Sequence, residues 1–368
     1  MSGMVKGWCP GAWRPMMSGD GLVIRVRPRL ARLERAAALG LAEIAARHGS
    51  GVIELTRRGN VQIRGVAPGD HDAVLGGLDA LGLIDPDPET ESRRNILVQP
   101  FWQQGDATHG LATQLARTLP DLPDLPAKFG LAIDAGTAPV LTRDPADIRI
   151  ERAATGLVVR AEGAPAGRAV TQDTAISTVL DLARWFATTR AKPERRMPAL
   201  LARVDLPRRF TGTCPLPPAP VARPGIGPHG PLAGAPLGQV TAADWDRAAR
   251  AATALRITPW RMLVLEGGDT VPEPFVSRPD DPILSVDACP GAPFCAAATV
   301  ATHAVARALA GQADSLHVSG CAKGCARSRP AAVTLIGRDG RFDLVKNGRA
   351  GDTPVRRGLT PSEITDAL

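Results

Sequence analysis

The sequence predicts an α+β fold assembled from several small domains. Its 368 residues correspond to two or three domains at ~150 residues each. Strands with alternating apolar residues and helices with apolar residues at helical spacing both occur along the chain. A strand–helix–strand–turn–strand unit near the N-terminus recurs after a proline-rich segment, so the order of elements indicates an internal duplication.

The first unit begins with a strand at residues 22–27, because Leu22, Ile24 and Val26 fall on one face of an extended chain. Apolar residues at helical spacing then predict a helix closed by Gly49 and Gly51: Leu30, Leu33, Ala37, Leu41 and Ile44. Strands at residues 52–56 and 61–66 enclose a turn. We expect this unit to fill residues 1–75.

The second unit is expected at residues 237–270. It has a strand at 237–240, a helix capped by Thr241 that runs to about Ala252, and a strand-rich stretch at 255–265. Glu54–Arg58 aligns with Arg256–Trp260, so only the first copy keeps an arginine at its last position. We expect the two copies to pair into one pseudo-symmetric unit.

Between the copies, residues 90–210 form a middle α+β domain. Its expected strands lie at 95–101, 131–136, 147–153 and 156–162, and a helix is expected near 174–189. Residues 211–236 contain eight prolines and are expected to be a linker. Gly225, Gly227 and Gly230 match a dinucleotide fingerprint by letters, but no strand precedes them and no helix follows, so we reject that interpretation.

The strongest motif lies in the last domain, at residues 275–368. Cys289 and Cys295 form a C-x5-C pair, and Cys321 and Cys325 form a C-x3-C pair. A helix-like stretch at 296–310 and a short strand at 316–319 separate the pairs and can bring them together. Four thiolates around one point suit a [4Fe-4S] cluster or zinc, although the wider pair is less usual for zinc.

Three glycines, Gly291, Gly320 and Gly324, would let backbone N–H groups approach the sulfurs of these cysteines. Cys9 and Cys214 fall outside the pattern, and we expect them to be inert small apolar residues.

Net charge, aromatic content and the lack of long apolar segments restrict the classes of molecule that this protein is expected to bind. A net charge of +7 would suit nucleic acid, an anionic membrane or a polycarboxylate ligand. The chain has no Tyr, 7 Phe and 6 Trp, which is few for stacking single-stranded bases. We find no signal peptide and no apolar run of ~18 residues. We therefore expect a cytoplasmic protein with free or metal-bound thiols, and no membrane or nucleic-acid partner.

The cysteine pattern resembles that of the sulfite/nitrite reductase superfamily, in which four cysteines hold a [4Fe-4S] cluster and the last also bridges to a siroheme iron. The resemblance implies that Cys289, Cys295, Cys321 and Cys325 are cluster ligands, with Cys325 as the bridge. It also implies a nitrite/sulfite reductase-like fold, in which the duplicated units are two ferredoxin-like half-domains and the other two domains bind the cofactors.

Basic residues extend the resemblance. Leu55–Gly65 is similar to an arginine-bearing strand–turn–strand of the superfamily, with Arg58 in the place of an active-site arginine. Arg94 and Lys128 match a further active-site arginine and the first of two active-site lysines. Arg64 shares a strand face with Gln62 and is expected to bind the cofactor. Lys323 either offsets cluster charge or is a solvated loop lysine.

Two departures define a narrower resemblance. The second lysine is replaced by Gly130, and the second cysteine loop has Ala322 and Lys323 where reductases carry Pro and Asn. Losing a cationic proton donor argues against sulfite reduction. Residues 9–28, 125–134, 288–295 and 319–326 together resemble the precorrin-3B synthase family of aerobic cobalamin biosynthesis.

That resemblance implies a monooxygenase that uses O2 and NADH to hydroxylate precorrin-3A at C20, with γ-lactone formation. The alternative is a siroheme-dependent, ferredoxin-type nitrite or sulfite reductase; a zinc or nucleic-acid-binding module is a third possibility. No flavin or nicotinamide fold is evident, so NADH electrons are expected through a separate reductase or small carrier.

The iron that activates O2 has two candidates. The resemblance predicts siroheme beside Cys325, but the substrate is chemically close to siroheme and could occupy that cavity instead. O2 would then need a mononuclear non-haem iron, for which the six scattered histidines form no clear two-His-one-carboxylate set.

Overall fold

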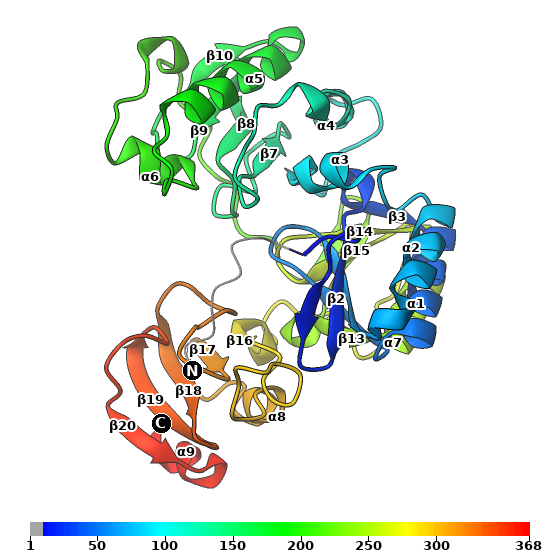
Figure 1. Ribbon diagram of the computed structural model, residues 1–368, viewed down its shortest axis with the longest axis vertical. Helices are drawn as coiled ribbons and strands as arrows, with labels where there is room; N and C mark the ends of the chain where they lie inside the picture. Colours follow the sequence, from blue (N-terminus) through cyan, green and yellow to red (C-terminus); the bar gives the residue numbers. More distant parts are fainter. Residues whose placement is uncertain (1–9) are drawn as a thin grey trace.

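The computed structural model describes residues 10–368 and has an α+β architecture, as the sequence predicts. Cys9 lies outside the described residues. Within the described residues, four five-stranded sheets carry the fold. In Figure 1 the middle domain lies at the top, the two duplicated units lie on the right, and the C-terminal domain lies at the bottom.

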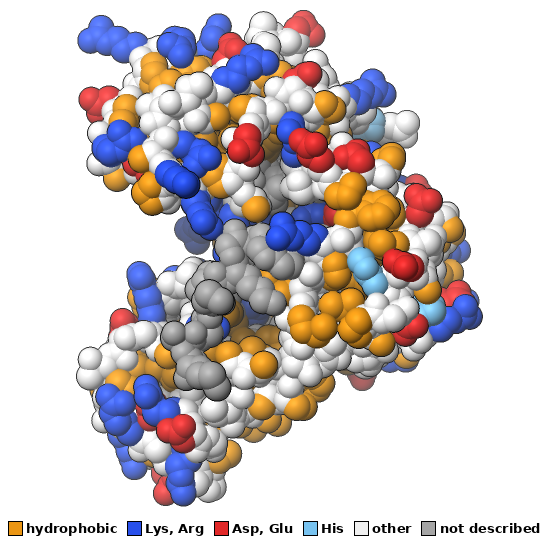
Figure 2. Space-filling model, in the orientation of Figure 1, with side chains coloured by type: hydrophobic (Ala, Val, Ile, Leu, Met, Phe, Trp, Pro, Cys, Tyr) orange, Lys and Arg blue, Asp and Glu red, His pale blue; other side chains and the backbone are white. Residues whose placement is uncertain are grey.

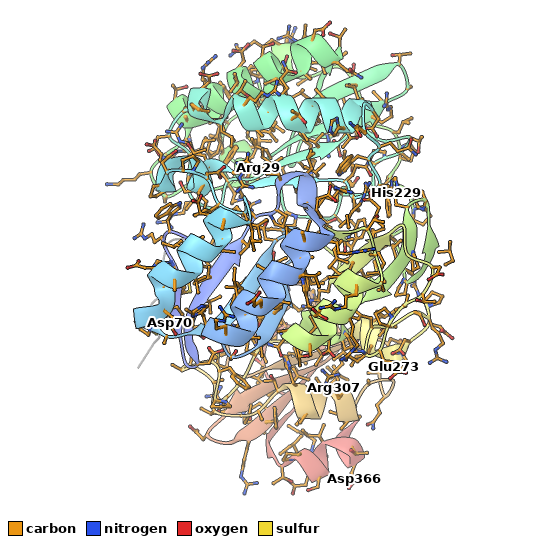
Figure 3. All side chains as sticks on the ribbon, turned by 90° about the vertical axis from the view of Figure 1, so that its right-hand side faces the viewer. Arg29, Asp70, His229, Glu273, Arg307 and Asp366 are labelled. Atoms are coloured by element: carbon orange, nitrogen blue, oxygen red, sulfur yellow. The ribbon has the colours of Figure 1, made fainter. Side chains whose placement is uncertain are left out.

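Two sheets belong to the duplicated units. The first contains β1 (Met16–Ser18), β2 (Gly21–Val26), β5 (Val61–Val66), β4 (Val52–Leu55) and β13 (Gln239–Thr241). The second contains β11 (Gly225–Gly227), β12 (Gly230–Gly234), β15 (Met262–Glu266), β14 (Ala254–Ile257) and β3 (Arg32–Glu34). The helices are α1 (Arg35–His48), α2 (His71–Ala80) and α7 (Ala242–Arg250), which lie side by side on the outer face in Figure 3.

Each copy gives one strand to the sheet of the other. Strand β3 of the first copy pairs with β14, and β13 of the second copy pairs with β4. The cores merge across this exchange, since the buried Trp245 of α7 donates its indole N–H to the carbonyl of Ala38 on α1 at 3.0 Å. The two copies therefore form one pseudo-symmetric body.

The first helix begins later than the spacing of apolar residues predicts. Leu30 lies in the short 3-10 segment η1 (Arg29–Ala31) with a φ of 54°, and Leu33 lies in β3 opposite Leu255. A left-handed residue ends helical geometry, and pairing with β14 uses the backbone that a helix would need. The second copy repeats the feature, because Leu237 in η5 (Pro236–Gly238) has a φ of 58°.

Part of the expected linker is structured. Residues 225–234 form the hairpin β11–β12, which joins the second sheet through β15. The prolines obscured this hairpin in the sequence, but Pro231 lies in β12 opposite Ile226 of the outermost strand β11. The glycines of the apparent dinucleotide motif lie in this hairpin.

The middle domain is one sheet with helices against it. Strands β6 (Ile96–Val98), β7 (Leu131–Asp134) and β8 (Ile148–Ala153) run parallel, and β9 (Gly156–Ala161) and β10 (Arg168–Val170) continue the sheet antiparallel. Its helices are α3 (Pro88–Arg93), α4 (Ala107–Arg117), α5 (Gln172–Thr189) and α6 (Met197–Leu201). Its short 3-10 segments are η3 (Leu119–Asp121) and η4 (Arg208–Phe210), whereas η2 (Pro68–Asp70) precedes α2 in the first unit.

The C-terminal domain repeats this strand order. Strands β16 (Val286–Ala288), β17 (Leu316–Ser319) and β18 (Ala331–Arg338) are parallel, and β19 (Arg341–Gly348) and β20 (Arg356–Leu359) are antiparallel. The remaining elements are η6 (Pro282–Ser285), α8 (His303–Ala308) and α9 (Pro361–Ala367). The order of elements thus indicates a second duplication, which the sequence analysis did not identify.

The helix expected at 296–310 is shorter than predicted, since α8 covers only 303–308. The preceding residues form turns in which Ala298 N–H donates to the carbonyl of Cys295 and Thr299 N–H to that of Gly320. Among residues 10–368, no helix has the length and apolarity needed to cross a bilayer.

Candidate functional site

The cysteine loops follow neighbouring parallel strands. Cys289 comes directly after β16, and Cys321 lies two residues after β17. Because β16 and β17 are parallel and paired, their carboxyl ends meet at one edge of the sheet and deliver both loops there. The parallel pairing of β16 with β17 therefore brings both cysteine loops to one edge of the sheet.

Close backbone contacts interlock the two loops. The N–H of Cys289 donates to the carbonyl of Val318 at 3.3 Å, and the N–H of Thr299 donates to Gly320 at 3.2 Å. A Cβ at Gly320 would lie 2.6 Å from that of Ala298, so glycine permits this approach. The N–H of Gly320 also donates to Sγ of Cys289 at 3.1 Å, as the sequence predicts.

The four thiols influence one another. Burial raises the pKa of the Cys289 thiol, the N–H groups of Gly320 and Gly291 oppose this, and Cys295 and Cys321 add to it. Although Cys325 is exposed, partial desolvation of its thiol raises its pKa, and the charges of the other three cysteines raise it further. The four thiols therefore act on one another electrostatically, and as thiolates they are the soft ligands that an iron–sulfur cluster or zinc takes.

The thiols lie on adjacent loops, but their side chains are not arranged to hold a metal ion. Within the described residues 10–368, no three His, Cys, Asp or Glu side chains could hold a metal ion as they stand. The fold brings the two cysteine loops together, and it places the N–H of Gly320 where it donates to the sulfur of Cys289. The four cysteine sulfurs are soft ligands. Binding a cluster would therefore require the thiol side chains to reorient.

Cys325 differs from the other loop thiols. It is exposed, whereas Cys289 is buried and Cys295 and Cys321 are intermediate. The positive charge of Lys323 lowers the pKa of Cys325 against the effect of burial, so this lysine lies where it can offset thiolate charge.

Arg64 does not face open solvent. It is buried, and its guanidinium donates to both carboxylate oxygens of Asp20 at 2.8 and 3.0 Å. It also donates to the backbone carbonyl of Phe294 at 3.1 Å. The residue thus contacts the first cysteine loop through the peptide group next to Cys295.

Asp287, two residues before Cys289, is the centre of an ion-pair network that the sequence analysis missed. Its carboxylate accepts from Arg57 at 3.1 Å, and lies 2.9 Å from Arg261 and 2.9 Å from Arg327. Burial would raise the pKa of Asp287, but the arginine charges outweigh burial and lower it. The network joins both duplicated units to both cysteine loops, and no local sequence signal marks Asp287 or Arg261.

The structure brings Arg58 and Lys128 together. Nη2 of Arg58 donates to the carbonyl of Lys128 at 3.1 Å. A Cβ at Gly130 would lie 3.2 Å from Nη1 of Arg58 and 3.3 Å from Nδ2 of Asn95. The guanidinium therefore packs closely against the position that a second lysine would occupy.

Lys128 is exposed and lines a surface depression of about 300 Å³, together with Arg190, Lys192 and Arg195. Figure 2 shows Lys and Arg side chains along the hollow between the middle and C-terminal domains. This arrangement is suited to an anionic ligand with several carboxylates.

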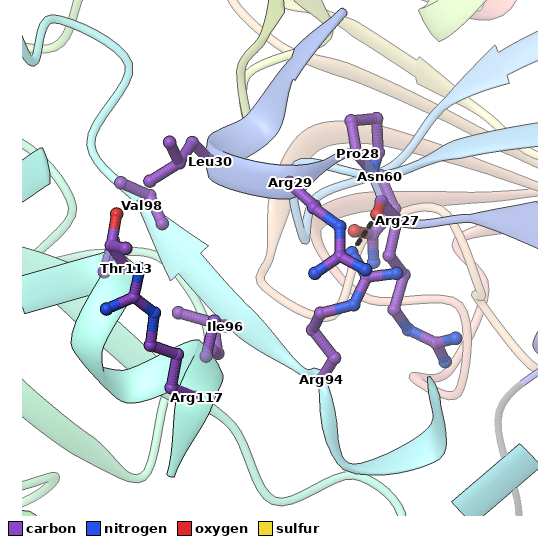
Figure 4. Close-up of a pocket in the computed structure, with 12 residues that line it drawn as sticks. Arg27, Pro28, Arg29, Leu30, Asn60, Arg94, Ile96, Val98, Thr113 and Arg117 are labelled. Carbon is purple, nitrogen blue, oxygen red and sulfur yellow. Dashed lines mark hydrogen bonds between the residues drawn. The ribbon is translucent and has the colours of Figure 1, made fainter. Parts of the chain in front are cut away.

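Arg94 lies apart from that pair. Its Nε donates to Asp85 at 2.7 Å and its Nη1 donates to the carbonyl of Arg27, while burial lowers its pKa. It lines a cavity of about 280 Å³ beside Arg27, Arg29 and Arg117 (Figure 4). The side chain is thus part of the wall between the first unit and the middle domain.

Two histidines lie near the cysteine loops. His317 on β17 is fully buried, and neither ring nitrogen has a hydrogen-bond partner in the part of the chain that the structure describes. Burial and the charges of nearby arginines such as Arg327 lower the pKa of His317 to about 4, although the charge of Asp287 acts to raise it. Burial and the charge of Arg307 likewise lower the pKa of His303 to about 4. Both rings are therefore neutral at physiological pH.

Comparison with known proteins agrees with this geometry. A family model described as the nitrite/sulfite reductase ferredoxin-like half domain matches residues 14–81. A relative from a Sinorhizobium species, named precorrin-3B synthase, is 30% identical, and the match covers 96% of this chain and 85% of the relative. This chain belongs to the precorrin-3B synthase family.

The fold of this precorrin-3B synthase family member is that of the nitrite and sulfite reductases. The solved structure of the Mycobacterium tuberculosis NirA protein matches it with a TM-score of 0.67, over 94% of this chain and 79% of that one. The two are 18% identical, so this likeness concerns the fold alone.

Proposed function

We propose that this chain is an oxidoreductase that hydroxylates precorrin-3A at C20 and closes a ring-A acetate to a γ-lactone. One oxygen atom of O2 would enter the ring and the other would leave as water, with two electrons from NADH. The observation that carries the proposal is that the two hydrogen-bonded cysteine loops meet at one edge of the β16–β17 sheet, in a member of the precorrin-3B synthase family.

Cys289, Cys295, Cys321 and Cys325 are the proposed ligands of a [4Fe-4S] cluster. A bound cluster would supply one-electron transfer. The N–H of Gly320 donates to Sγ of Cys289 and would stabilise its thiolate. Lys323, whose charge lowers the pKa of Cys325, would offset part of the negative charge of the loop.

Arg58 and Lys128 are the proposed binding groups for the substrate. Early corrin precursors carry many carboxylates, which arginine binds bidentately and lysine binds as a point charge. Arg58 donates to the backbone carbonyl of Lys128, so the two residues are neighbours in the fold, and the proposal assigns both charges to one ligand. Arg94, fixed by Asp85, would shape the wall rather than move with the substrate.

The proposal includes an iron centre in addition to the cluster. This centre is either a siroheme or a mononuclear non-haem iron. A siroheme would take Cys325 as a shared ligand, which the exposure of this thiol supports. Alternatively, the substrate occupies the equivalent cavity and a mononuclear non-haem iron is present. Electrons from NADH would arrive through a separate reductase or carrier.

The test is anaerobic purification followed by analysis of iron, sulfide, zinc and extractable tetrapyrrole, and then by turnover. Iron and sulfide, with O2-dependent conversion of precorrin-3A, would support the proposal. Iron beyond the cluster without an extractable macrocycle would favour the mononuclear site. A colourless, zinc-loaded protein would refute the cluster.

The same preparation tests the reductase alternative. Reduction of sulfite or nitrite by reduced viologen, without conversion of precorrin-3A, would replace our proposal with a siroheme-dependent reductase. The close packing of Gly130 against Arg58 favours the oxygenase, because any side chain at position 130 would press on the guanidinium and require it to shift.

A further inference from the structure

The carbonyl of Phe294, in the peptide group that precedes Cys295, accepts three hydrogen bonds from the first unit. The Ser18 hydroxyl donates at 2.7 Å, the Gly19 N–H donates at 3.1 Å, and Nη2 of Arg64 donates at 3.1 Å. These donors come from the β1–β2 turn and from β5, more than 200 residues away in sequence.

The N–H of this peptide group and the next carbonyl along the chain are also hydrogen-bonded. The N–H of Cys295 donates to the carbonyl of Gly291 at 2.8 Å, and the carbonyl of Cys295 accepts from Ala298 at 2.9 Å. With both ends of the Phe294–Cys295 peptide bonded, the backbone that carries the thiol has one orientation, and only the side chain can rotate.

The three donors to the Phe294 carbonyl, Ser18, Gly19 and Arg64, are here called the clamp, and they are themselves held in place. Arg64 is buried and bound by both oxygens of Asp20, which belongs to the same turn as Ser18, and it lies 3.4 Å from Glu54. Gly19 fits against the loop without space for a side chain, because a Cβ there would lie 2.5 Å from the carbonyl oxygen of Pro293. Turn and arginine therefore act as one unit.

We propose that Arg64, with Ser18 and Gly19, is a positioning device that sets the orientation of Cys295 for its metal group. Arg64 acts through the peptide group and not by contact with the substrate, which revises its expected role as a direct cofactor contact. The inference rests on the proposed function only for the identity of the group that Cys295 binds. The hydrogen bonds that fix the backbone of Cys295 do not depend on that function.

The test compares Arg64→Gln, Ser18→Ala and Gly19→Ala with wild type and with Arg160→Gln. Arg160 is a matched control, since it is also buried and bound by both oxygens of Glu151, but it lies in the middle domain. The first measurement uses full-length, iron-free protein and follows alkylation of Cys295 by iodoacetamide, with the exposed Cys214 as internal reference.

We expect several-fold faster alkylation of Cys295 in the three clamp variants, an unchanged rate for Cys214, and wild-type rates in Arg160→Gln. In reconstituted protein, we expect a shifted electron paramagnetic resonance signal and midpoint potential in the clamp variants alone. Unchanged Cys295 reactivity in all three, or the same change in Arg160→Gln, would overturn the inference.

This design separates the two proposals. If wild type binds no cluster but the alkylation rates change as expected, the clamp stands and the cluster fails. If the cluster forms with the same spectrum and potential in every variant and the alkylation rates do not differ, the proposed function stands and the clamp fails.

Discussion

Arg58 and Trp260 occupy the same position in two copies of one turn. Oγ1 of Thr56 accepts the N–H groups of Arg58 and Asn60 at 3.3 and 3.2 Å. Oγ1 of Thr258 accepts those of Trp260 and Met262, both at 3.2 Å. One copy thus presents a guanidinium beside Lys128, and the other presents an indole that donates to Asp144.

Replacing Arg58 with Gln should weaken substrate binding. A lost charge-assisted hydrogen bond costs about 1.5–3 kcal/mol, so KM for precorrin-3A should rise roughly ten- to hundredfold with little change in kcat. Steady-state kinetics measure this. Arg184→Gln, on the exposed surface of α5, should leave KM unchanged. Equal KM values in both variants would remove Arg58 from the binding site.

Much of this site could be predicted from the sequence, for identifiable reasons. The cysteine spacing and the strand at 316–319 are local signals, but the shared sheet edge depends on the parallel pairing of that strand with β16, which the sequence analysis did not predict. The exchange of β3 and β13 leaves no such signal, because a three-residue strand is defined by its distant partner. At Ala298 the local signal is present but misleading. The alanine-rich stretch around it predicts a helix, but close packing of Ala298 against Gly320 gives the chain a turn conformation instead.

Gly130→Lys should not create a sulfite reductase. Its Cβ would lie 3.2 Å from Nη1 of Arg58, so the new side chain would displace the guanidinium. We expect a raised KM for precorrin-3A and no sulfite reduction with reduced viologen. Gly130→Ala is the milder control and should raise KM less. Sulfite turnover by Gly130→Lys with an unchanged KM would contradict this interpretation.

Cys325→Ser should abolish both the visible absorption and turnover, since serine is a poor ligand for iron in a thiolate site. Iron and sulfide analysis, with the spectrum near ~400 nm, measures the loss. Cys214→Ser is the matched control, because Cys214 is exposed and lies outside both loops. A coloured, active Cys325→Ser protein would exclude this thiol as an essential ligand.

Asp287→Asn should destabilise the protein strongly. It would leave Arg57, Arg261 and Arg327 without their shared carboxylate, and breaking a buried pair costs about 3–5 kcal/mol. Asp246→Asn removes an exposed pair with Arg250 and should cost less than about 1 kcal/mol. Urea unfolding of both iron-free variants gives the comparison, and similar midpoints would show that the network contributes little.

His317 should make the protein sensitive to acid. Its pKa falls from 6.5 to about 4 on folding, chiefly through burial, so the unfolded chain binds a proton first as pH drops. Stability attributable to this ring is therefore lost between pH 6.5 and about 4. The loss should be on the order of 2–3 kcal/mol.

The measurement is urea unfolding of iron-free protein at pH 7 and pH 4.5. His317→Leu, which cannot titrate, should lose less stability than wild type over this interval. Asp287, Arg327, Arg57 and Arg261 also act on the ring, so the comparison uses the difference between the two proteins at each pH. An identical pH dependence would assign the acid sensitivity to other groups.

The exchanged strands also determine when the chain can fold during synthesis. Strand β4 has an open edge until residues 239–241 leave the ribosome and pair with it, and β14 needs β3 from the far earlier copy. A nascent chain that ends before Gln239 therefore exposes a sheet edge ready to pair with a neighbouring chain. Translation of the second copy thus completes the first sheet.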